Sequence, residues 1–484
     1  MKKFLIKNGK IFFPDRQFRK GNIVIQDKKI KHIYFNEKEK IDVKNSLDAN
    51  GKIIVPGFID SHTHLLQEAI KIMRINLSKA DSVDGMFDMI KEGLKQYKRG
   101  DTIIASDFDE SNWPVKQIPD RIMLDKISPQ NPLVIRRICG HIAVANTLAL
   151  KKIGNNWKGV NKKTGVMTED VPLNINRIFP PESSDVIKGL RQIVKKANAY
   201  GITSINEIVN ASQVHFYEQL GEDLTLNVRV YIPLSEIGEI KKPDIAFKKT
   251  TFGGIKLFAD GSIGARTAAN DFYYKDTYGK KGKLIYTTGK LLDIIEDAES
   301  EGIQLVIHAI GNRAIRQVLT GYERKIGKTN PLRHRIEHCE LIDEKDIDRM
   351  AKLEIIASMQ PNFISQWSQP GGMYEALLGN RYRFNNPVAQ LMAKGIIVAF
   401  GSDCMPLSPL FGIKSVMNAP FSSQRISKED ALFNYTKNSA YAGFTLFKEG
   451  EIKPGKEANL VILDNKLKKV YMTIFKGRCV YSKN

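Results

Sequence analysis

The stretch IIVPGFIDSHTH, residues 53–64, joins an unbroken apolar run to a polar end that carries two histidines. A continuous apolar run suits a strand that is buried on both faces, as in the parallel sheet of an α/β fold. Residues two apart on an extended segment point the same way, so His62 and His64 should face one site. The stretch therefore predicts a buried parallel strand with a pair of imidazoles at its carboxyl end.

Seven further apolar runs of the same kind follow along the chain. They occupy residues 202–206, 226–232, 254–260, 303–309, 333–339, 354–360 and 395–403. Helical periodicity separates several of them, as in LLDIIEDAESEG before Ile303. Eight strands that alternate with helices are the count of a closed barrel, so the sequence predicts an α/β protein built on a TIM (β/α)8 barrel.

Two β-rich ends and one long gap define the predicted domains. Short strands and turns in residues 1–52 and 450–484 predict a small β-sandwich domain built from both termini. About 140 residues separate the first two barrel strands, far more than a connecting helix needs. We therefore expect the barrel to comprise 53–69 plus 186–449, and 70–185 to form an inserted subdomain that covers the active site.

The composition excludes several classes of protein. With 484 residues, 42% apolar and 26% charged, the chain is an ordinary globular one. No window approaches 18 apolar residues, which argues against a spanning helix, and Lys7 interrupts the first apolar stretch too early for a signal peptide. The four cysteines lie far apart and form no CxxC pair, so neither a disulfide framework nor a thiolate zinc site is indicated. We expect a reducing, cytoplasmic location.

A net charge of +21 raises the question of nucleic-acid binding. Proteins that bind nucleic acid usually cluster their lysines and arginines along one face or tail. Here they are dispersed, as in IQDKKIKHI and IKEGLKQYKRG, which indicates a solvated, lysine-rich surface. We expect neither a specific nucleic-acid partner nor a membrane partner.

Side chains of the metal-ligand type collect at the predicted strand ends. Besides His62 and His64, His308 ends the fifth strand, His338 the sixth and Asp403 the eighth. Catalytic groups of such barrels lie at these ends. Nitrogen and carboxylate ligands without cysteine fit zinc, or another borderline divalent ion, at a catalytic site that keeps an open position.

Lys256 is an unusual residue for its place inside the apolar run GIKLFAD. A buried ammonium is costly unless it is paired. Two explanations remain open: an acidic partner such as Asp260 neutralises the lysine, or the lysine is chemically converted into an anion. No GxSxG nucleophile motif and no GxGxxG dinucleotide loop is present in the sequence.

The motifs VPGFIDSHTH, KLFADGSIGARTA, HAIGNRA, RIEH, QPNF and GSDCMP together resemble the amidohydrolase superfamily. More narrowly they resemble its amidohydrolase-3 branch, which includes N-substituted formamide deformylases. The metal ligands that the resemblance implies are His62, His64, Lys256, His308, His338 and Asp403, with Lys256 carboxylated and shared by two metals. Asn312 and Asn459 depart from the branch pattern, because each stands where an aspartate is usual.

Six further residues are candidates for contacting the substrate or for orienting the ligands. They are His141, Asp260, Arg266, Arg313, Arg335 and Glu337. His141 lies in the predicted insertion and resembles a branch motif that faces the substrate. The others flank ligand histidines or follow the fourth strand, where barrels bind substrate.

The predicted function is hydrolysis of a non-peptide carbon–nitrogen bond, in an amide or formamide, by a metal-activated hydroxide. Asp403 would act as general base and then general acid. One or two divalent ions per chain, most simply zinc, and a small amide-type substrate are expected, and a homo-oligomer is compatible with the sequence. Two alternatives remain: a ring deaminase that uses the same metal site, and a non-catalytic basic scaffold.

Overall fold

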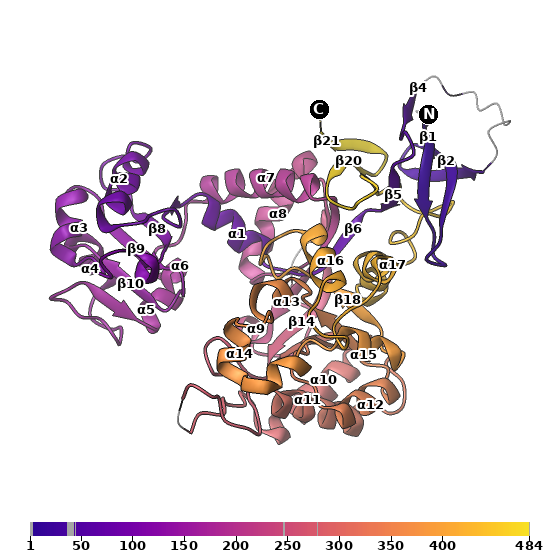
Figure 1. Ribbon diagram of the computed structural model, residues 1–484. Coiled ribbons are helices and arrows are strands. Elements are labelled where there is room, and N and C mark those ends of the chain that lie inside the picture. The colour runs from indigo at the N-terminus through magenta and orange to yellow at the C-terminus, as the bar shows by residue number, and fades with distance from the viewer. Residues whose placement is uncertain (1–2, 36–42, 44, 245–246, 278, 484) are drawn as a thin grey trace. The chain divides into compact units, whose positions relative to one another are not determined.

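The computed structural model describes residues 3–35, 43, 45–244, 247–277 and 279–483. The chain divides into two compact units (Figure 1). The barrel unit comprises Met1–Leu65 and Ile193–Asn484, and the insert unit comprises Leu66–Gln192.

Eight parallel strands form the centre of the barrel unit. They are β6 (Phe58–Thr63), β12 (Ile202–Ile208), β13 (Asn227–Pro233), β14 (Thr250–Phe258), β15 (Leu305–Ala309), β16 (Arg335–His338), β17 (Ile356–Met359) and β18 (Val398–Phe400), and each pairs with the next in chain order. The last strand meets the first through the residues that follow it. The Asp403 amide donates to the His62 carbonyl over 2.9 Å, and the Ser402 amide donates to the Asp60 carboxylate over 2.8 Å. The predicted α/β class and TIM barrel are confirmed.

The first barrel strand differs from its predicted extent of 53–60. Residues Ile53–Pro56 form β5, which belongs to the sheet of the chain termini, and the barrel strand begins at Phe58. Gly57 separates the two strands at a point where a Cβ atom would lie 2.1 Å from the Thr203 hydroxyl oxygen. The apolar run is continuous in sequence because both strands are buried, so periodicity alone could not divide it.

Helices cover the outside of the barrel. They are α8 (Val214–Gln219), α9 (Leu234–Ile237), α10 (Thr288–Ser300), α11 (Asn312–Lys325), α12 (Glu344–Lys352), α13 (Asn362–Trp367), α14 (Met373–Leu378), α15 (Val388–Ala393), α16 (Pro409–Met417), α17 (Lys428–Phe433) and α18 (Ser439–Ala442). Figure 1 shows α10, α11 and α12 side by side. In α11 the buried Ala314, Ile315, Val318 and Tyr322 follow the helical period, and this face packs toward the barrel.

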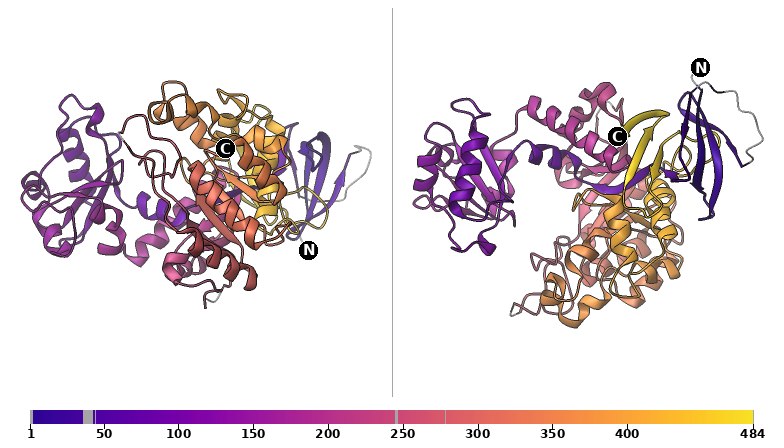
Figure 2. Two further views of the ribbon diagram at one scale, coloured as in Figure 1. Left: turned by 90° about the horizontal axis from the view of Figure 1, so that it is seen from below. Right: turned by 45° about the horizontal axis from the view of Figure 1, so that its top comes forward.

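Strands from both ends of the chain share one β-domain (Figure 2). They are β1 (Lys3–Phe12), β2 (Phe18–Gln26), β3 (Lys29–Tyr34), β4 (Asn45–Asp48), β5, β19 (Leu460–Leu463), β20 (Val470–Phe475) and β21 (Arg478–Ser482). The first half of β1 pairs with β4 and its second half with β5, so the sheet divides around one apolar core that includes Ile6, Ile23, Leu460 and Ile474. This is the predicted β-sandwich of the two termini.

The insert unit is built around a five-stranded mixed sheet of its own. Its strands are β7 (Ile75–Asn76), β8 (Ile103–Phe108), β9 (Leu133–Arg137), β10 (Ile142–Ala145) and β11 (Val166–Thr168). Its helices are α2 (Val83–Leu94), α3 (Arg121–Ile127), α4 (Thr147–Ile153), α5 (Asp170–Leu173) and α6 (Ile175–Ile178), while α1 (Leu65–Ile72) and α7 (Ser183–Ala199) lie at its ends. Leu133 and Ile135 face one apolar cluster and Val134 the other, so both faces of the sheet are covered. Across the described residues, no helix has both the length and the apolar character that a membrane span requires.

Candidate metal centre

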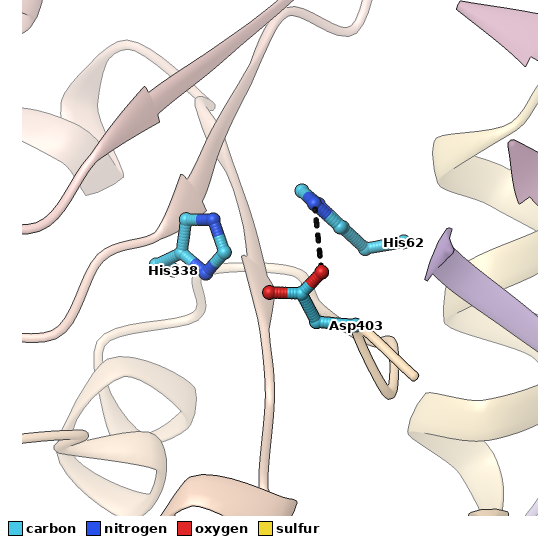
Figure 3. Close-up of side chains that lie close together, drawn as sticks. All are labelled: His62, His338 and Asp403. Carbon is cyan, nitrogen blue, oxygen red and sulfur yellow. Dashed lines mark ion pairs between the residues drawn. The ribbon is translucent and has the colours of Figure 1, made fainter. Parts of the chain in front are cut away.

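Three ligand-type side chains from distant parts of the sequence meet at the carboxyl end of the barrel. His62 lies in β6, His338 ends β16, and Asp403 follows β18 (Figure 3). One ligand atom from each residue lies within 4.8 Å of the other two. The Asp403 carboxylate is turned toward both imidazoles, and its Oδ1 atom is 3.8 Å from His62 Nε2. The three residues therefore form a compact donor set.

His64 and His308 flank this set on either side. The His64 Nε2 atom is 3.3 Å from Asp403 Oδ1, the same oxygen that faces His62. The ring centroid of His308 lies 4.5 Å from that of His338, which lies 4.9 Å from that of His62. All five residues predicted from the strand ends thus lie at one end of the barrel.

Burial keeps the four imidazoles of this end uncharged. It lowers the pKa of His64 to about 4 and that of His308 to about 3, and the nearby positive charge of Lys256 acts in the same direction. The pKa values of His62 and His338 fall well below 6.5 for the same principal reason. A neutral imidazole has the free lone pair that a metal requires.

Hydrogen bonds select which ring nitrogen is free. Glu337 contacts His62 Nδ1, and Arg335 holds that carboxylate through an Nε donor at 2.8 Å. A carboxylate at Nδ1 favours the tautomer that leaves the Nε2 lone pair free toward the site. His308 Nε2 lies 3.0 Å from the Gly261 carbonyl and donates to it, which leaves Nδ1 as the acceptor. The sequence-predicted Arg335 and Glu337 therefore act on the orientation of His62.

Three buried nitrogen atoms at this end of the barrel, one of them Arg335 Nη1, have no hydrogen-bond partner within the described part of the chain, and two of them belong to predicted metal ligands. These two are His338 Nδ1 and Lys256 Nζ. Buried polar atoms normally have a partner, so unpaired ones call for an explanation. Neutral ring nitrogens, a carboxylate and an unpaired lysine form a donor set that fits a divalent metal. The residues of this site are therefore compatible with the divalent metal that the sequence predicts.

Lys256 lies in β14 with 1% of its surface exposed, and burial lowers its pKa to about 8. Its Nζ atom is 4.9 Å from the centre of the Phe258 ring. Asp260 is not its partner among the described contacts. The Asp260 carboxylate instead accepts backbone hydrogen bonds from Ala269 and Gly311 at 2.8 Å and from Ile310 at 3.0 Å. Asp260 thus holds the loops after β14 and β15 and is not the acidic partner of Lys256; the negative charges that act on Lys256 are those of Glu337 and Asp403.

The backbone is constrained at two of the strand ends. His338 and Cys339 have φ angles of 69° and 51°, and Asp403 and Cys404 have φ angles of 50° and 57°. These angles lie in the left-handed region, which residues other than glycine rarely adopt. Such conformations concentrate at functional sites, where the surrounding structure must hold them. Here they turn His338 and Asp403 sharply at the ends of their segments, toward the shared centre.

Comparison of the sequence with profiles of known families identifies the family of this chain. The profile of the amidohydrolase family matches residues 46–481. The chain belongs to the amidohydrolase family. The predicted resemblance and the prediction of a hydrolytic enzyme are confirmed.

Individual relatives of this amidohydrolase cover most of both chains. The protein YtcJ of Bacillus subtilis is 25% identical over 490 residues, 90% of each chain. The N-substituted formamide deformylase of Arthrobacter pascens is 25% identical over 86% of this chain and 84% of its own. A crystal structure of an uncharacterized metal-dependent hydrolase from Pyrococcus horikoshii superimposes with a TM-score of 0.82 at 25% identity, covering 99% of this chain and all of that one.

Three other predicted site residues have partners of their own outside the donor set. Arg266 pairs with Asp276 and donates to the Gly264 carbonyl at 2.7 Å. Arg313 reaches the Asn270 carbonyl at 3.5 Å. His141 lies in the insert unit, where its Nδ1 atom is 2.9 Å from the Glu169 carboxylate. The described partners of Arg266 and Arg313 belong to loops that strand patterns do not describe.

The two asparagines that depart from the family pattern each lie between two carboxylates. The Asn312 amide donates to Asp271 at 2.8 Å and to Asp343 at 3.1 Å. The Asn459 amide donates to Glu449 at 3.2 Å and to Glu457 at 3.1 Å. An aspartate at either position would offer only acceptors to two carboxylates. Both asparagines therefore serve local hydrogen-bond networks, which accounts for the amide at each position.

Sequence analysis missed one residue at this end of the barrel. Glu207 lies near the end of β12 and is fully buried. Its Oε2 atom accepts hydrogen bonds from the Thr63 hydroxyl at 2.7 Å and the Leu65 amide at 2.8 Å. The rule that selects polar residues at strand ends applies to the second strand as well, so ITSINEI contained the signal.

Proposed function

We propose that this amidohydrolase hydrolyses a non-peptide carbon–nitrogen bond in an amide or formamide. The main support is the convergence of His62, His338 and Asp403, whose ligand atoms lie within 4.8 Å at the functional end of a barrel. We further propose that His64 and His308 complete the ligand set and that the metal is zinc, because zinc favours nitrogen and carboxylate ligands of this kind. The formamide deformylase among the relatives names a reaction of the proposed class.

The proposed mechanism assigns each step to a residue. A divalent ion here would supply the Lewis acidity that lowers the pKa of water from about 15.7 to about 7. Asp403 accepts the proton of the attacking water and later donates it to the leaving nitrogen. Glu337 holds His62 in one tautomer, and the Phe363 ring lies parallel to His338 at 6.1 Å, which limits rotation of that imidazole.

A carboxylated Lys256 would extend this site to a second ion. Its neutral amine attacks carbon dioxide, a nitrogen–carbon bond forms, and one proton leaves to give a carbamate anion. The burial of Lys256 favours the neutral amine that this step needs. His62 and His64 would then hold one ion, His308 and His338 the other, and the Lys256 carbamate both.

Two of the predicted arginines are already paired with carboxylates. Arg335 is held by Glu337 and Arg266 by Asp276. A substrate carboxylate would need a free guanidinium to bind in two-point fashion, so these two residues do not favour an anionic substrate. We propose a neutral, small amide as the substrate. The four cysteines are free thiols, which supports the proposal of a cytoplasmic location.

Metal analysis combined with a substrate screen tests the proposal. The purified protein is assayed for bound metal and then offered neutral formamides, acyl amides and amino-heterocycles, with release of amine or ammonia as the readout. Metal-dependent release from amides supports the proposal. Release from heterocycles alone identifies the ring deaminase and refutes it, and the absence of bound metal and turnover refutes the catalytic site.

The role of Lys256 is tested separately. Lys256→Ala should lose one metal equivalent and most activity, and a short carboxylic acid such as propionate should restore part of both. The carbamate carbon should also give a distinct signal in 13C NMR after exposure to labelled carbon dioxide. Full activity in Lys256→Ala would refute the bridging role.

A further inference from the structure

Residues at the end of β12 contact one proposed ligand, His64, and both of its neighbours in the chain. Glu207 is the sixth residue of this strand and pairs in register with Thr63 of β6. Its Oε2 atom accepts from the Thr63 hydroxyl at 2.7 Å and from the Leu65 amide at 2.8 Å. These two residues precede and follow His64. The backbone of the next residue, Ile208, hydrogen-bonds His64 and favours its charged form.

We propose that Glu207 is a positioning residue, which sets the direction of the His64 imidazole by fixing the backbone on both sides of it. This inference rests on the proposed role of His64 as a metal ligand. Glu207 contacts no reacting atom in this proposal and acts through residues 63–65.

His64 needs such support more than its neighbours do. Its side chain is 33% exposed, whereas that of His62 is 1% exposed and His338 is buried. His62 also has Glu337 at its ring. Packing therefore restricts His64 less than the other ligands, so the direction of its ring depends more on the Ile208 hydrogen bond and on the path of its own backbone.

The carboxylate also suits the start of α1. Leu65 is the first residue of this helix, and the first amides of a helix have no partner within it. An anion near a helix N-terminus is stabilising. One oxygen of Glu207 thus satisfies a helix amide and a buried hydroxyl at once, and Thr63 is fully buried. The turn between β6 and α1, which carries His64, is thereby fixed to the neighbouring strand.

Because both donors bond to the same oxygen of Glu207, the proposal can be tested by comparing a variant that keeps this oxygen with one that removes the side chain. Both donors meet Oε2, so the carbonyl oxygen of a glutamine can accept both of them. Glu207→Gln should therefore bind zinc within about threefold of the wild type, whereas Glu207→Ala should bind it roughly 10- to 100-fold more weakly, the usual effect of removing a partner that orients a ligand. In Glu207→Ala loaded with cobalt(II), the visible absorption spectrum should change, since it reports the ligand geometry directly.

A matched control lies at the opposite end of the same strand. Glu449 is also buried, contacts Ser204 of β12, and accepts from Asn227 at 2.9 Å. Glu449→Ala should lower thermal stability but leave zinc affinity and the cobalt spectrum unchanged. A merely structural role of Glu207 would give the same result as this control.

The outcomes separate this inference from the proposed function. If wild-type protein binds no metal, or if His64→Ala binds it normally, both fail. If binding depends on His64 but Glu207→Ala retains wild-type affinity and spectrum, the positioning role alone is wrong. Should Glu207→Ala not fold, Thr63→Val removes one of the two donors, and wild-type affinity in that variant overturns the inference.

Discussion

Replacing Asn312 by aspartate restores the residue usual for the family and should nevertheless destabilise this protein. Asn312 is 4% exposed at the start of α11, and its amide donates to Asp271 at 2.8 Å and Asp343 at 3.1 Å. It also accepts from the Asp271 amide at 3.0 Å. Asn312→Asp keeps this acceptor but removes both donor bonds and adds a negative charge beside two others.

The size of the effect follows from these contacts. Each lost hydrogen bond to a charged group is worth about 1.5–3 kcal/mol. The side chains of Asp271 and Asp343 are 49% and 39% exposed, and Arg316 contacts both, so solvent and this guanidinium screen much of the added repulsion. Because both aspartates are partly exposed, we take the lower end of this range for each of the two bonds and expect a total loss of about 3 kcal/mol in the free energy of unfolding. With an unfolding entropy of about 2.1 cal/mol/K per residue and a cooperative unit of roughly 350 residues, Tm falls by about 4 °C.

Calorimetry of three variants tests this reasoning. Asn312→Ala loses the bond from the Asp271 amide as well as the two donor bonds but adds no charge, so its Tm should also fall below that of the wild type. The double variant Asn312→Asp, Asp343→Asn returns an amide to the cluster and should recover most of the loss. A Tm of Asn312→Asp within 1 °C of wild type, or no recovery in the double variant, would refute the explanation.

Three further predictions address the site and the surface. His62→Ala and Asp403→Ala should each lose metal and hydrolysis while the circular dichroism spectrum stays that of the wild type, because both lie at the functional end of the barrel; substantial turnover in either would contradict the ligand assignment. Burial lowers the pKa of Lys256 from 10.5 to about 8, so below pH 8 the buried charge lowers the free energy of unfolding of the metal-free protein. Metal-free Lys256→Met should therefore resist urea better than metal-free wild type at pH 7, and this advantage should shrink as the pH rises from 8 to 10.5; an advantage that does not change with pH would be inconsistent with this. Binding to duplex DNA should be weak and lost on adding salt, as expected for dispersed lysines, and salt-resistant binding in a titration would disprove it.

The barrel could be predicted because its strands are buried on both faces and stand out as apolar runs. The same property concealed the division at Gly57, since β5 and β6 are both buried although they belong to different sheets. The approach of His62, His338 and Asp403 followed from the rule that parallel strands of a barrel end at one face. By contrast, the partners of Arg266 and Arg313 lie in loops after β14, whose path no periodic pattern encodes.

The left-handed backbone at His338 and Asp403 was the feature that the sequence predicted least. It explains how residues at the ends of short strands can direct their side chains to one point. A side chain at the end of a regular strand would continue the alternation of the barrel, inward or outward. At φ angles of 69° and 50° the chain departs from that alternation just where each residue stands. Such angles cost free energy in residues other than glycine, so packing elsewhere must enforce them. For Asp403 that enforcement is visible, because its own amide donates to the His62 carbonyl and the preceding Ser402 amide donates to the Asp60 carboxylate. The contacts that join the last strand to the first therefore also bring the Asp403 carboxylate to the His62 imidazole. The same hydrogen bonds close the barrel and assemble the site.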